Sequence, residues 1–317
     1  MARPRPGSSA RLPRPRGGRA GPSDLRAVRS SHRARWRARL SRHQRARQAV
    51  TLTVDELTVL ADRLLTAPIE VVGRFGDASN ATLLVRLTDR DPRSLTELAE
   101  ALGRDPELDD LEPEDLAVYK PQRGERPLWD FPDGTLHRRE VAAHEVSAAL
   151  GWDQVPTTVL RTDGPFGVGS LQRYVAHDLE QHYFTLLEQG DTEVVAQLEA
   201  MVVFDALIEN ADRKAGHVLC APGPPDRVWL IDHGVTFHTE AKLRTVAWEL
   251  AGDEVPPRLL ADVDRLREGL AGGFGARLAT LLTEEEVLAL EARVVTLLEQ
   301  GTFPHPSVRH PYPWPLL

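Results

Sequence analysis

The stretch Glu209-Asn-Ala-Asp-Arg-Lys-Ala-Gly-His217, followed by Val228-Trp-Leu-Ile-Asp-His-Gly234, decides the fold. Before it, residues 192–208 carry apolar side chains at the 3.6-residue spacing of a helix with one buried stripe. Within it, two short apolar runs flank Ala221-Pro-Gly-Pro-Pro-Asp226, a turn sequence that predicts a β-hairpin. A hairpin brings its strand ends together, so Asp212 and Asp232 are expected at the same edge.

This order of helix, aspartate loop, hairpin and Asp-x-Gly is the layout by which kinases place two carboxylates beside a γ-phosphate, one catalytic and one magnesium-binding. Protein kinases have an asparagine five residues after the catalytic aspartate, whereas here that position is His217. Aspartates at turns and strand ends are also ordinary turn chemistry. The ordered block, rather than either motif alone, therefore favours the kinase interpretation.

The composition is that of a soluble globular protein. The chain has 317 residues, 41% of them hydrophobic, which is enough for a substantial core in one or two domains. No run of 18 apolar residues occurs, so we expect no membrane-spanning helix. A single cysteine, Cys220, excludes an internal disulfide framework. Because the first residues also lack the apolar core of a secretory signal, we expect a cytoplasmic location.

Residues 1–50 differ from the rest of the chain. They hold fifteen arginines and one acidic residue, Asp24, with almost no large apolar side chains. Such a composition does not offset the entropy of ordering, so we interpret the segment as a disordered Arg/Pro-rich extension that precedes a true start near Val50. A linker or a basic arm for nucleic acid or an acidic membrane are the alternatives. Nothing outside this arm indicates nucleic-acid binding.

The remaining chain is expected to be α+β, with a strand-rich lobe at 51–175, a helical lobe at 176–302 and a Pro-rich tail at 303–317, docked or loose. The sequence predicts five strands in an antiparallel meander and three late helices. The helix that precedes the strands is expected to begin with a capping box at Thr53-Val-Asp-Glu56 and to bury Leu57, Leu60, Leu64 and Leu65. The strands are expected at 69–72, 81–87, 116–120, 155–160 and 169–175. Residues 89–115 are expected to form a solvated excursion with a short helix at 94–102. The late helices are expected at 257–270, 275–282 and 283–298.

Several residues of the strand-rich lobe are candidates for nucleotide contacts. Residues 73–80 form a glycine-containing loop whose backbone N–H groups and Ser79 and Asn80 side chains suit phosphates, although an ordinary hairpin turn explains the loop as well. Lys120 ends the third strand, where kinases hold a phosphate-binding lysine. The following helix, at 138–150 and closed by Gly151, offers Glu140 and Glu145 on nearly opposite faces, and the first-turn Glu140 is favoured.

Two further segments complete the predicted cleft. The last strand leaves the sheet at residues 172–175, where a hinge would present backbone groups to an adenine, so Gln172 is a candidate contact. Between Lys120 and its helix lies Gln122-Arg-Gly-Glu-Arg-Pro-Leu-Trp-Asp-Phe-Pro-Asp-Gly134. Its Trp129 and Phe131 either belong to a lid that reaches over the cleft or contacts substrate, or they anchor the loop on the core.

From about Val54 to Pro256, the chain resembles an actinobacterial family of phosphatidylinositol 3- and 4-kinase-like proteins. This family belongs to the protein-kinase-like superfamily that also includes HipA-type kinases. The resemblance rests on Tyr119-Lys-Pro121, Gly124-Glu-Arg-Pro-Leu-Trp-Asp-Phe-Pro132, Arg139-Glu-Val-Ala-Ala143, Val155-Pro156, Asn210-Ala-Asp-Arg-Lys214 and Ile231-Asp-His-Gly234.

The resemblance implies a bilobal protein-kinase-like fold, with an antiparallel N-lobe sheet, one helix beside it and a mainly helical C-lobe. It implies Lys120 and Glu140 as the phosphate-binding pair, Asp212 as the catalytic carboxylate and Asp232 on magnesium. His217 departs from the kinase asparagine. Because hard magnesium prefers oxygen ligands, an imidazole there indicates manganese use, or slow or lost transfer.

Three functional hypotheses follow. The first is an ATP- and magnesium-dependent phosphotransferase whose acceptor is an unidentified protein, small molecule or lipid. The second is a nucleotide-binding pseudokinase that acts as a regulatory interaction module, suggested by His217. The third is a metallohydrolase built on His217, Asp232, His233 and His238, which leaves Lys120 without a role.

Overall fold

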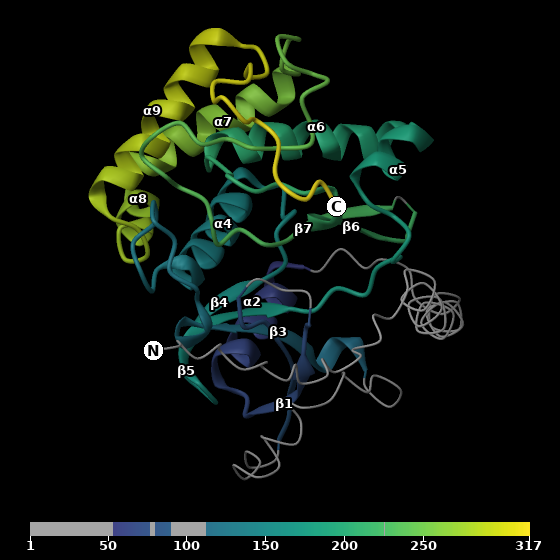
Figure 1. The fold of residues 1–317 in the computed structure, drawn as a ribbon, viewed down its shortest axis with the longest axis vertical. Helices are drawn as coiled ribbons and strands as arrows, with labels where there is room; N and C mark the ends of the chain where they lie inside the picture. Colours follow the sequence, from purple (N-terminus) through teal and green to yellow (C-terminus); the bar gives the residue numbers. More distant parts are fainter. Residues whose placement is uncertain (1–52, 77–79, 90–111, 225) are drawn as a thin grey trace, which may run out of the picture. The chain divides into compact units, whose positions relative to one another are not determined.

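Five strands in the first half of the chain form one antiparallel sheet (Figure 1). The structure is a computed structural model that describes residues 53–76, 80–89, 112–224 and 226–317. All of these residues belong to one compact unit, Arg47–Leu317. The expectations for residues 1–50, for Ser79 and for a short helix at 94–102 lie outside the described residues. The strands are β1 (Ile69–Arg74), β2 (Leu83–Leu87), β3 (Leu116–Pro121), β4 (Thr158–Gly164) and β5 (Gly167–Arg173).

The strand order is β1-β2-β3-β5-β4, so the predicted meander is wrong in its last two strands. β5 pairs with β3, placing Ser170 opposite Lys120, and β4 lies at the edge beyond β5. The helix that joins β3 to β4 contacts both β4 and β5. The connection therefore crosses over the sheet, and the β4–β5 hairpin returns the chain to the place beside β3.

Helix α2 (Val54–Thr66) covers one face of this sheet and packs against β4 and β5. It begins as predicted, because Thr53 and Glu56 form a reciprocal capping box. Leu64 is completely buried in the cluster that also contains Tyr119 and Leu171. Leu65 was expected on the same apolar face, but it is 46% exposed, because it directly follows Leu64 and so points about 100° away around the helix.

Helix α4 (Leu136–Leu150) starts two residues earlier than predicted. The carboxylate of Glu125 accepts hydrogen bonds from the backbone N–H groups of Leu136 and His137, so a residue from the preceding loop supplies the cap. The helix ends at Gly151, which adopts the left-handed conformation with φ +73°. Its Ala142, Ala143, Val146 and Leu150 belong to the core of the helical half, so α4 ties the two lobes together.

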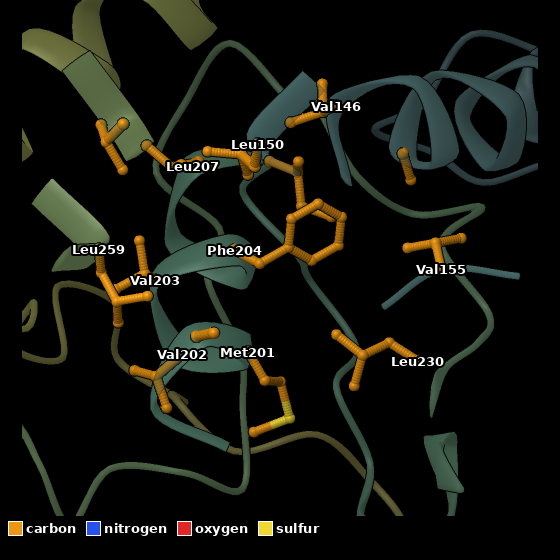
Figure 2. Packing of buried hydrophobic residues seen from close by; sticks show 14 of the residues in the cluster. Val146, Leu150, Val155, Met201, Val202, Val203, Phe204, Leu207, Leu230 and Leu259 are labelled. Atoms are coloured by element: carbon orange, nitrogen blue, oxygen red, sulfur yellow. The ribbon is translucent and has the colours of Figure 1, made fainter. Parts of the chain in front are cut away.

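Helix α6 (Thr192–Leu207) forms the centre of the larger core. Asp191 caps it by accepting from the N–H groups of Glu193 and Val194. A single buried stripe was expected, but every residue from Ala200 to Asp205 is buried. Figure 2 shows the reason, since Phe204 and Met201 point toward Leu230 while Val202 and Val203 point toward Leu259 on the other side. Neighbouring elements enclose the second half of the helix on all sides.

The helical lobe also contains the predicted hairpin, β6 (Val218–Ala221) with β7 (Arg227–Leu230). Around the hairpin and α6 lie α5 (Tyr183–Gln189), α7 (Pro257–Leu270), α8 (Gly273–Leu278) and α9 (Glu284–Gln300). Short 3-10 turns occur at Pro113–Asp115, Gln122–Gly124 and Ala215–His217. Among the described residues, the structure contains no helix with the length and apolar content needed to cross a membrane.

The Pro-rich tail at 303–317 is docked rather than loose. Its Phe303 exchanges backbone hydrogen bonds with Gly252 and Asp253. Farther along, the carbonyl of Pro311 accepts from the Thr245 N–H (3.0 Å), and the carbonyl of Leu316 accepts from the Ala215 N–H (2.8 Å). The tail therefore reaches the loop that holds the candidate catalytic residues.

Candidate active site

A lysine and two acidic residues meet between the sheet and α4. Lys120 lies on the β3 face opposite the buried Ala117 and Tyr119, so its side chain points away from the α2 core. Its Nζ pairs with Oε1 of Glu140 and lies 3.0 Å from Oδ1 of Asp232. The structure thus joins three of the residues that the sequence singles out.

The choice between the two α4 glutamates is decided by this geometry. Glu140 is 3% exposed and contacts Lys120, and its other oxygen accepts from the His233 N–H at 3.0 Å. Glu145 instead faces Arg277 at 3.9 Å. Glu140 is therefore the glutamate that meets Lys120, while its role in a reaction stays a prediction.

The charges of this cluster stabilise one another. Burial by itself lowers the pKa of Lys120, but the neighbouring Asp232 and Glu140 outweigh burial and raise the pKa above its usual value. The positive charge of Lys120 holds the pKa of Asp232 well below its usual range, against the opposing effect of burial. Both side chains are therefore charged at neutral pH.

Asp232 has a left-handed backbone, with φ +62°. This conformation is unfavourable for a residue other than glycine and persists only where neighbouring contacts fix it. On one side of Asp232, the Ile231 N–H donates to the His217 carbonyl (3.1 Å). On the other side, the His233 N–H donates to Glu140. The constraint turns the Asp232 carboxylate toward Lys120.

The loop before the hairpin is held by an arginine that is 0% exposed, Arg213. Its guanidinium pairs with Asp205 of α6 at 2.9 Å, and it donates to the Ile231 carbonyl at 2.9 Å. The side chain of Asn210 also donates to Asp205. Arg213 therefore connects α6, the Asp212 loop and the strand end that carries Asp232, a function that the sequence interpretation missed.

Asp212 lies beside a second cation that the sequence interpretation also missed. Lys214 Nζ pairs with Oδ2 of Asp212. Burial raises the pKa of Asp212, and Lys214 opposes part of that increase. A carboxylate with a raised pKa is a better proton acceptor than a carboxylate with its ordinary pKa in water. The signal for Lys214 was its position two residues after Asp212, on the same side of an extended loop.

His217 lies next to Asp232. Its Nε2 is 3.4 Å from Oδ2 of Asp232. Burial lowers the pKa of His217 to about 4, so the imidazole is neutral at pH 7. Its Nδ1 is buried and has no hydrogen-bond partner among the described residues. A neutral imidazole beside a carboxylate offers one nitrogen and one oxygen donor, which suits manganese better than magnesium.

The remaining nucleotide candidates do not join this cluster through any contact found in the described part of the chain. Ser79 lies outside it. The Asn80 side-chain oxygen accepts from the Arg126 N–H at 2.9 Å, which ties the β1–β2 loop to the segment after β3.

Gln172 faces the same side of the sheet as Lys120, because its partner in β3 is Val118. Its amide donates to Thr158 Oγ1, and the strand stays paired through Arg173. The predicted departure from the sheet at Gln172 is therefore too early, while a nucleotide contact at this residue stays a prediction. The chain leaves the sheet after Tyr174, whose N–H still bonds the Leu116 carbonyl.

Two of the three histidines that suggested a metallohydrolase, His233 and His238, have partners elsewhere. His233 is 0% exposed and contacts Arg213. His238 bonds the Asp130 carbonyl through Nε2 and packs on the ring of Phe131. Among the residues that the structure describes, no three His, Cys, Asp or Glu side chains are arranged to hold a metal ion. The metallohydrolase hypothesis therefore has no support.

The segment after β3 divides its two aromatic residues between different environments. Phe131 is 6% exposed and packs with Leu136, Ala211 and Val235, next to Asp212. Trp129 is 90% exposed, with the Nζ of Lys242 lying 4.7 Å from its ring centroid. Phe131 is thus the anchor of this segment, and Trp129 faces solvent.

Comparison with known proteins identifies the fold. No family model matches the chain. A structure of the Golgi casein kinase with Mn/ADP bound is similar, with a TM-score of 0.50 and 14% identity over 81% of each chain. The structure of hydra Fam20 with sugar gives a TM-score of 0.48 and 14% identity, covering 81% of this chain and 91% of that one. The likeness to the Golgi casein kinase shows that the bilobal α+β fold is kinase-like, in agreement with the sequence.

A curated relative is much closer in sequence. Protein Rv2133c of Mycobacterium tuberculosis (strain ATCC 25618 / H37Rv) is 41% identical over 298 residues. The alignment covers 84% of this chain and 97% of the relative. With identity of this level along most of both sequences, the chain belongs to the family of Protein Rv2133c.

Proposed function

We propose that the protein is an ATP-dependent phosphotransferase of the phosphatidylinositol 3-/4-kinase-like type, with Asp212 as its catalytic carboxylate. The observation that carries the proposal is the contact of Lys120 with both Glu140 and Asp232 in a kinase-like fold. Asp212 lies in the loop that Arg213 connects to the same strand end. This arrangement supplies a cation for phosphates and a half-buried carboxylate for an acceptor hydroxyl.

The proposed reaction is an in-line phosphoryl transfer. Asp212 orients the acceptor hydroxyl and takes its proton while the oxygen bonds to the γ-phosphorus. The bond from that phosphorus to the bridging β–γ oxygen breaks, and ADP leaves with the bonding electrons. Lys120 neutralises charge on the phosphates, and Glu140 holds Lys120 in place. Lys214, paired with Asp212, is positioned to contact the transferred group.

The donor atoms near Asp232 fit a divalent cation that is also bound by nucleotide phosphates. Magnesium is usually held by one or two carboxylates together with substrate phosphates, and the Asp232 side chain is 50% exposed and ionised. Asp232 would hold the cation, with His217 as a nitrogen donor that favours manganese over magnesium. When bound, the cation supplies charge neutralisation on the phosphate oxygens.

His217 also supports a second candidate function, a pseudokinase that binds nucleotide without transferring phosphate. The imidazole replaces the kinase asparagine, and its buried Nδ1 has no partner among the described residues. If this replacement removes a required cation contact, the nucleotide would still bind through Lys120, and the protein would act by recruiting a partner.

Nucleotide binding is the first test. We expect ATP with magnesium or manganese to raise the melting temperature of the full chain. At an ATP concentration of 100 times the dissociation constant, the free energy of unfolding should increase by about 2.7 kcal/mol. Lys120→Ala and Asp232→Ala should abolish the increase, because each removes a charge that faces the phosphates. Arg267→Ala, at an exposed arginine of α7, is the control and should keep it. An equal increase in all variants would contradict the placement of the nucleotide.

Transfer is the second test, and it separates the two candidate functions. Asp212→Asn should keep the ATP-induced stabilisation but lower phosphate transfer, or hydrolysis of ATP by water, by about 10²- to 10⁴-fold. Transfer can be measured with γ-labelled ATP. A wild-type protein that binds ATP without any turnover would support the pseudokinase, and full transfer by the Asp212→Asn variant would exclude Asp212 as the base.

A further inference from the structure

An arginine, Arg244, lies on the chain segment beside the Asp212 loop. Residues 244–246 run parallel to residues 212–214, with Arg213 paired to Thr245. The Arg213 N–H donates to the Arg244 carbonyl (3.0 Å), and the Val246 N–H donates to the Arg213 carbonyl (3.2 Å). The two chain segments are therefore directly adjacent, at about the 4.8 Å spacing of neighbouring strands.

The alternation of side chains places Arg244 on the same face as Asp212. Arg213 is 0% exposed and its partner Thr245 is 2% exposed, so both point into the protein. The residues before them in each segment, Asp212 and Arg244, then point to the opposite face. Both are half-buried. Lys214, two residues after Asp212, pairs with it on that face, as the alternation requires.

Arg244 differs from the other arginines near the site in having no acidic partner. Within the described residues, its guanidinium makes no hydrogen bond or ion pair, although its backbone N–H bonds the Asn210 carbonyl at 2.9 Å. By contrast, Arg139 pairs with Glu286, Arg213 with Asp205 and Arg293 with Glu209. A half-buried guanidinium without a counter-ion is suited to a ligand's anionic group, since arginine stays charged and can bind phosphate or carboxylate through two hydrogen bonds.

The tail limits what kind of acceptor can reach this face. An extended peptide on this surface would be held through backbone N–H donors of the segments that line it. The tail already uses two of them, because Pro311 accepts from the Thr245 N–H and Leu316 accepts from the Ala215 N–H. Pro311 also accepts from the Trp248 side chain through Nε1 (2.9 Å). With the tail docked, the Ala215 and Thr245 N–H groups, one from each of the two adjacent segments, are occupied by the protein's own chain.

From the Arg244 guanidinium, unpaired within the described residues, and the docked tail, we infer that the phosphate acceptor is a small molecule carrying a phosphate or carboxylate group. Arg244 binds this anionic group, while the hydroxyl of the acceptor faces Asp212. The inference rests on the proposed phosphotransferase function and adds the acceptor class to it. The transfer is balanced as above, since the acceptor oxygen bonds to the γ-phosphorus, its proton goes to Asp212 and ADP leaves.

Anion binding tests the inference without requiring the natural acceptor. The full chain, saturated with magnesium and a non-hydrolysable ATP analogue, is titrated with inorganic phosphate and followed by NMR. We expect Arg244→Ala to weaken phosphate binding by about 10- to 100-fold, the effect of losing a hydrogen-bonded charge. Arg267→Ala, at an exposed arginine of α7, should leave it unchanged. An unchanged dissociation constant in Arg244→Ala would overturn the inference alone. Failure of the analogue to bind would overturn the phosphotransferase proposal, and this inference with it.

Matched acceptors test the same inference through turnover. Transfer from γ-labelled ATP is compared for glycerol against glycerol 3-phosphate and for glucose against glucose 6-phosphate. The wild type should prefer the phosphorylated member of a pair. Arg244→Ala should lose that preference, whereas the control Arg267→Ala should keep it. Transfer to a library of serine, threonine and tyrosine peptides that is insensitive to Arg244→Ala would overturn the inference in favour of a protein acceptor.

Discussion

A fully buried arginine holds the candidate catalytic residues in place. Arg213 contacts Asp205 of α6, the carbonyls of His217 and Ile231, and the ring of His233. These contacts reach the helix before the Asp212 loop and both ends of the hairpin after it. Removing a charge from water is costly, so its retention requires the complete set of partners around it. Arg213 is thus a positioning residue, one step removed from the residues proposed to bind phosphate.

We therefore predict that Arg213→Met destabilises the protein by about 3–5 kcal/mol, because Asp205 is left as an uncompensated buried charge. Urea unfolding of the full chain measures the change in the free energy of unfolding. The double variant Arg213→Met with Asp205→Leu is the control, since it removes both charges and should recover much of the loss. Equal stabilities of the wild type and the single variant would contradict the prediction.

At this scale, the sequence identifies residues whose chemistry depends on spacing along the chain. Lys120 at a strand end and Asp232 in Asp-x-Gly are recognisable by order, and the structure brings them together with Glu140. Arg213 was not recognised, because its importance comes from partners in α6 and β7 that only the folded chain brings near. The point where the last strand leaves the sheet was expected too early, at Gln172, for a similar reason, since strand pairing depends on the order of the strands.

Helix α9 has a complete capping box as its local start signal and also makes a long-range contact. Thr283 accepts from the Glu286 N–H, and the Glu286 carboxylate accepts from the Thr283 N–H. The second Glu286 oxygen pairs with the buried Arg139, which is adjacent to Glu140 in α4. Glu286 thus caps α9 and also holds α4, the helix that carries Glu140, the partner of Lys120.

Thr283→Ala should cost about 1 kcal/mol of stability, within the range of about 0.5–2 kcal/mol for lost caps, because the first-turn N–H of Glu286 loses its acceptor. The matched control is Thr296→Ala in the same helix. Thr296 is exposed and bonds only the Ala292 carbonyl one turn back, so its replacement should change stability by less than about 0.5 kcal/mol. Thermal unfolding of both variants measures the difference, and equal losses would refute a special contribution from the cap.

Helix boundaries were predictable where the signal is local and not where it is distant. The capping boxes at Thr53 and Thr283 are complete in the sequence, and both helices begin there. The start of α4 depends on Glu125, eleven residues before Leu136, and no short-range pattern contains that contact. The strand order likewise depends on the crossover through α4.

For the molecule as a whole, α4 is the element that joins two separate cores. The sheet and α2 share one apolar cluster, while the buried alanines and valine of α4 belong to the larger cluster around α6. Arg139 reinforces this attachment by pairing with α9 and donating to the Thr236 carbonyl. Glu140 therefore extends from a helix fixed to the helical lobe, toward a lysine on the sheet.

Buried histidines make the stability of the whole protein sensitive to mild acid. Burial lowers the pKa of His144, His177 and His233 below the usual value of 6.5 and that of His217 to about 4. The unfolded chain binds protons at these positions near pH 6.5, and the folded chain does so only at lower pH. Their contribution is therefore present above pH 6.5 and lost as the pH falls toward the folded pKa values.

We predict that the free energy of unfolding decreases as the pH is lowered from 7.5 to 5.5, most steeply below 6.5. Each histidine that is protonated only in the unfolded chain contributes about 1.4 kcal/mol per pH unit. Urea unfolding at pH 7.5, 6.5 and 5.5 measures the slope. His177→Gln removes one of these groups and should reduce the slope, since the glutamine does not titrate. A stability that is independent of pH, or a slope unchanged in the variant, would show that these imidazoles are protonated as readily in the folded protein as in the unfolded chain.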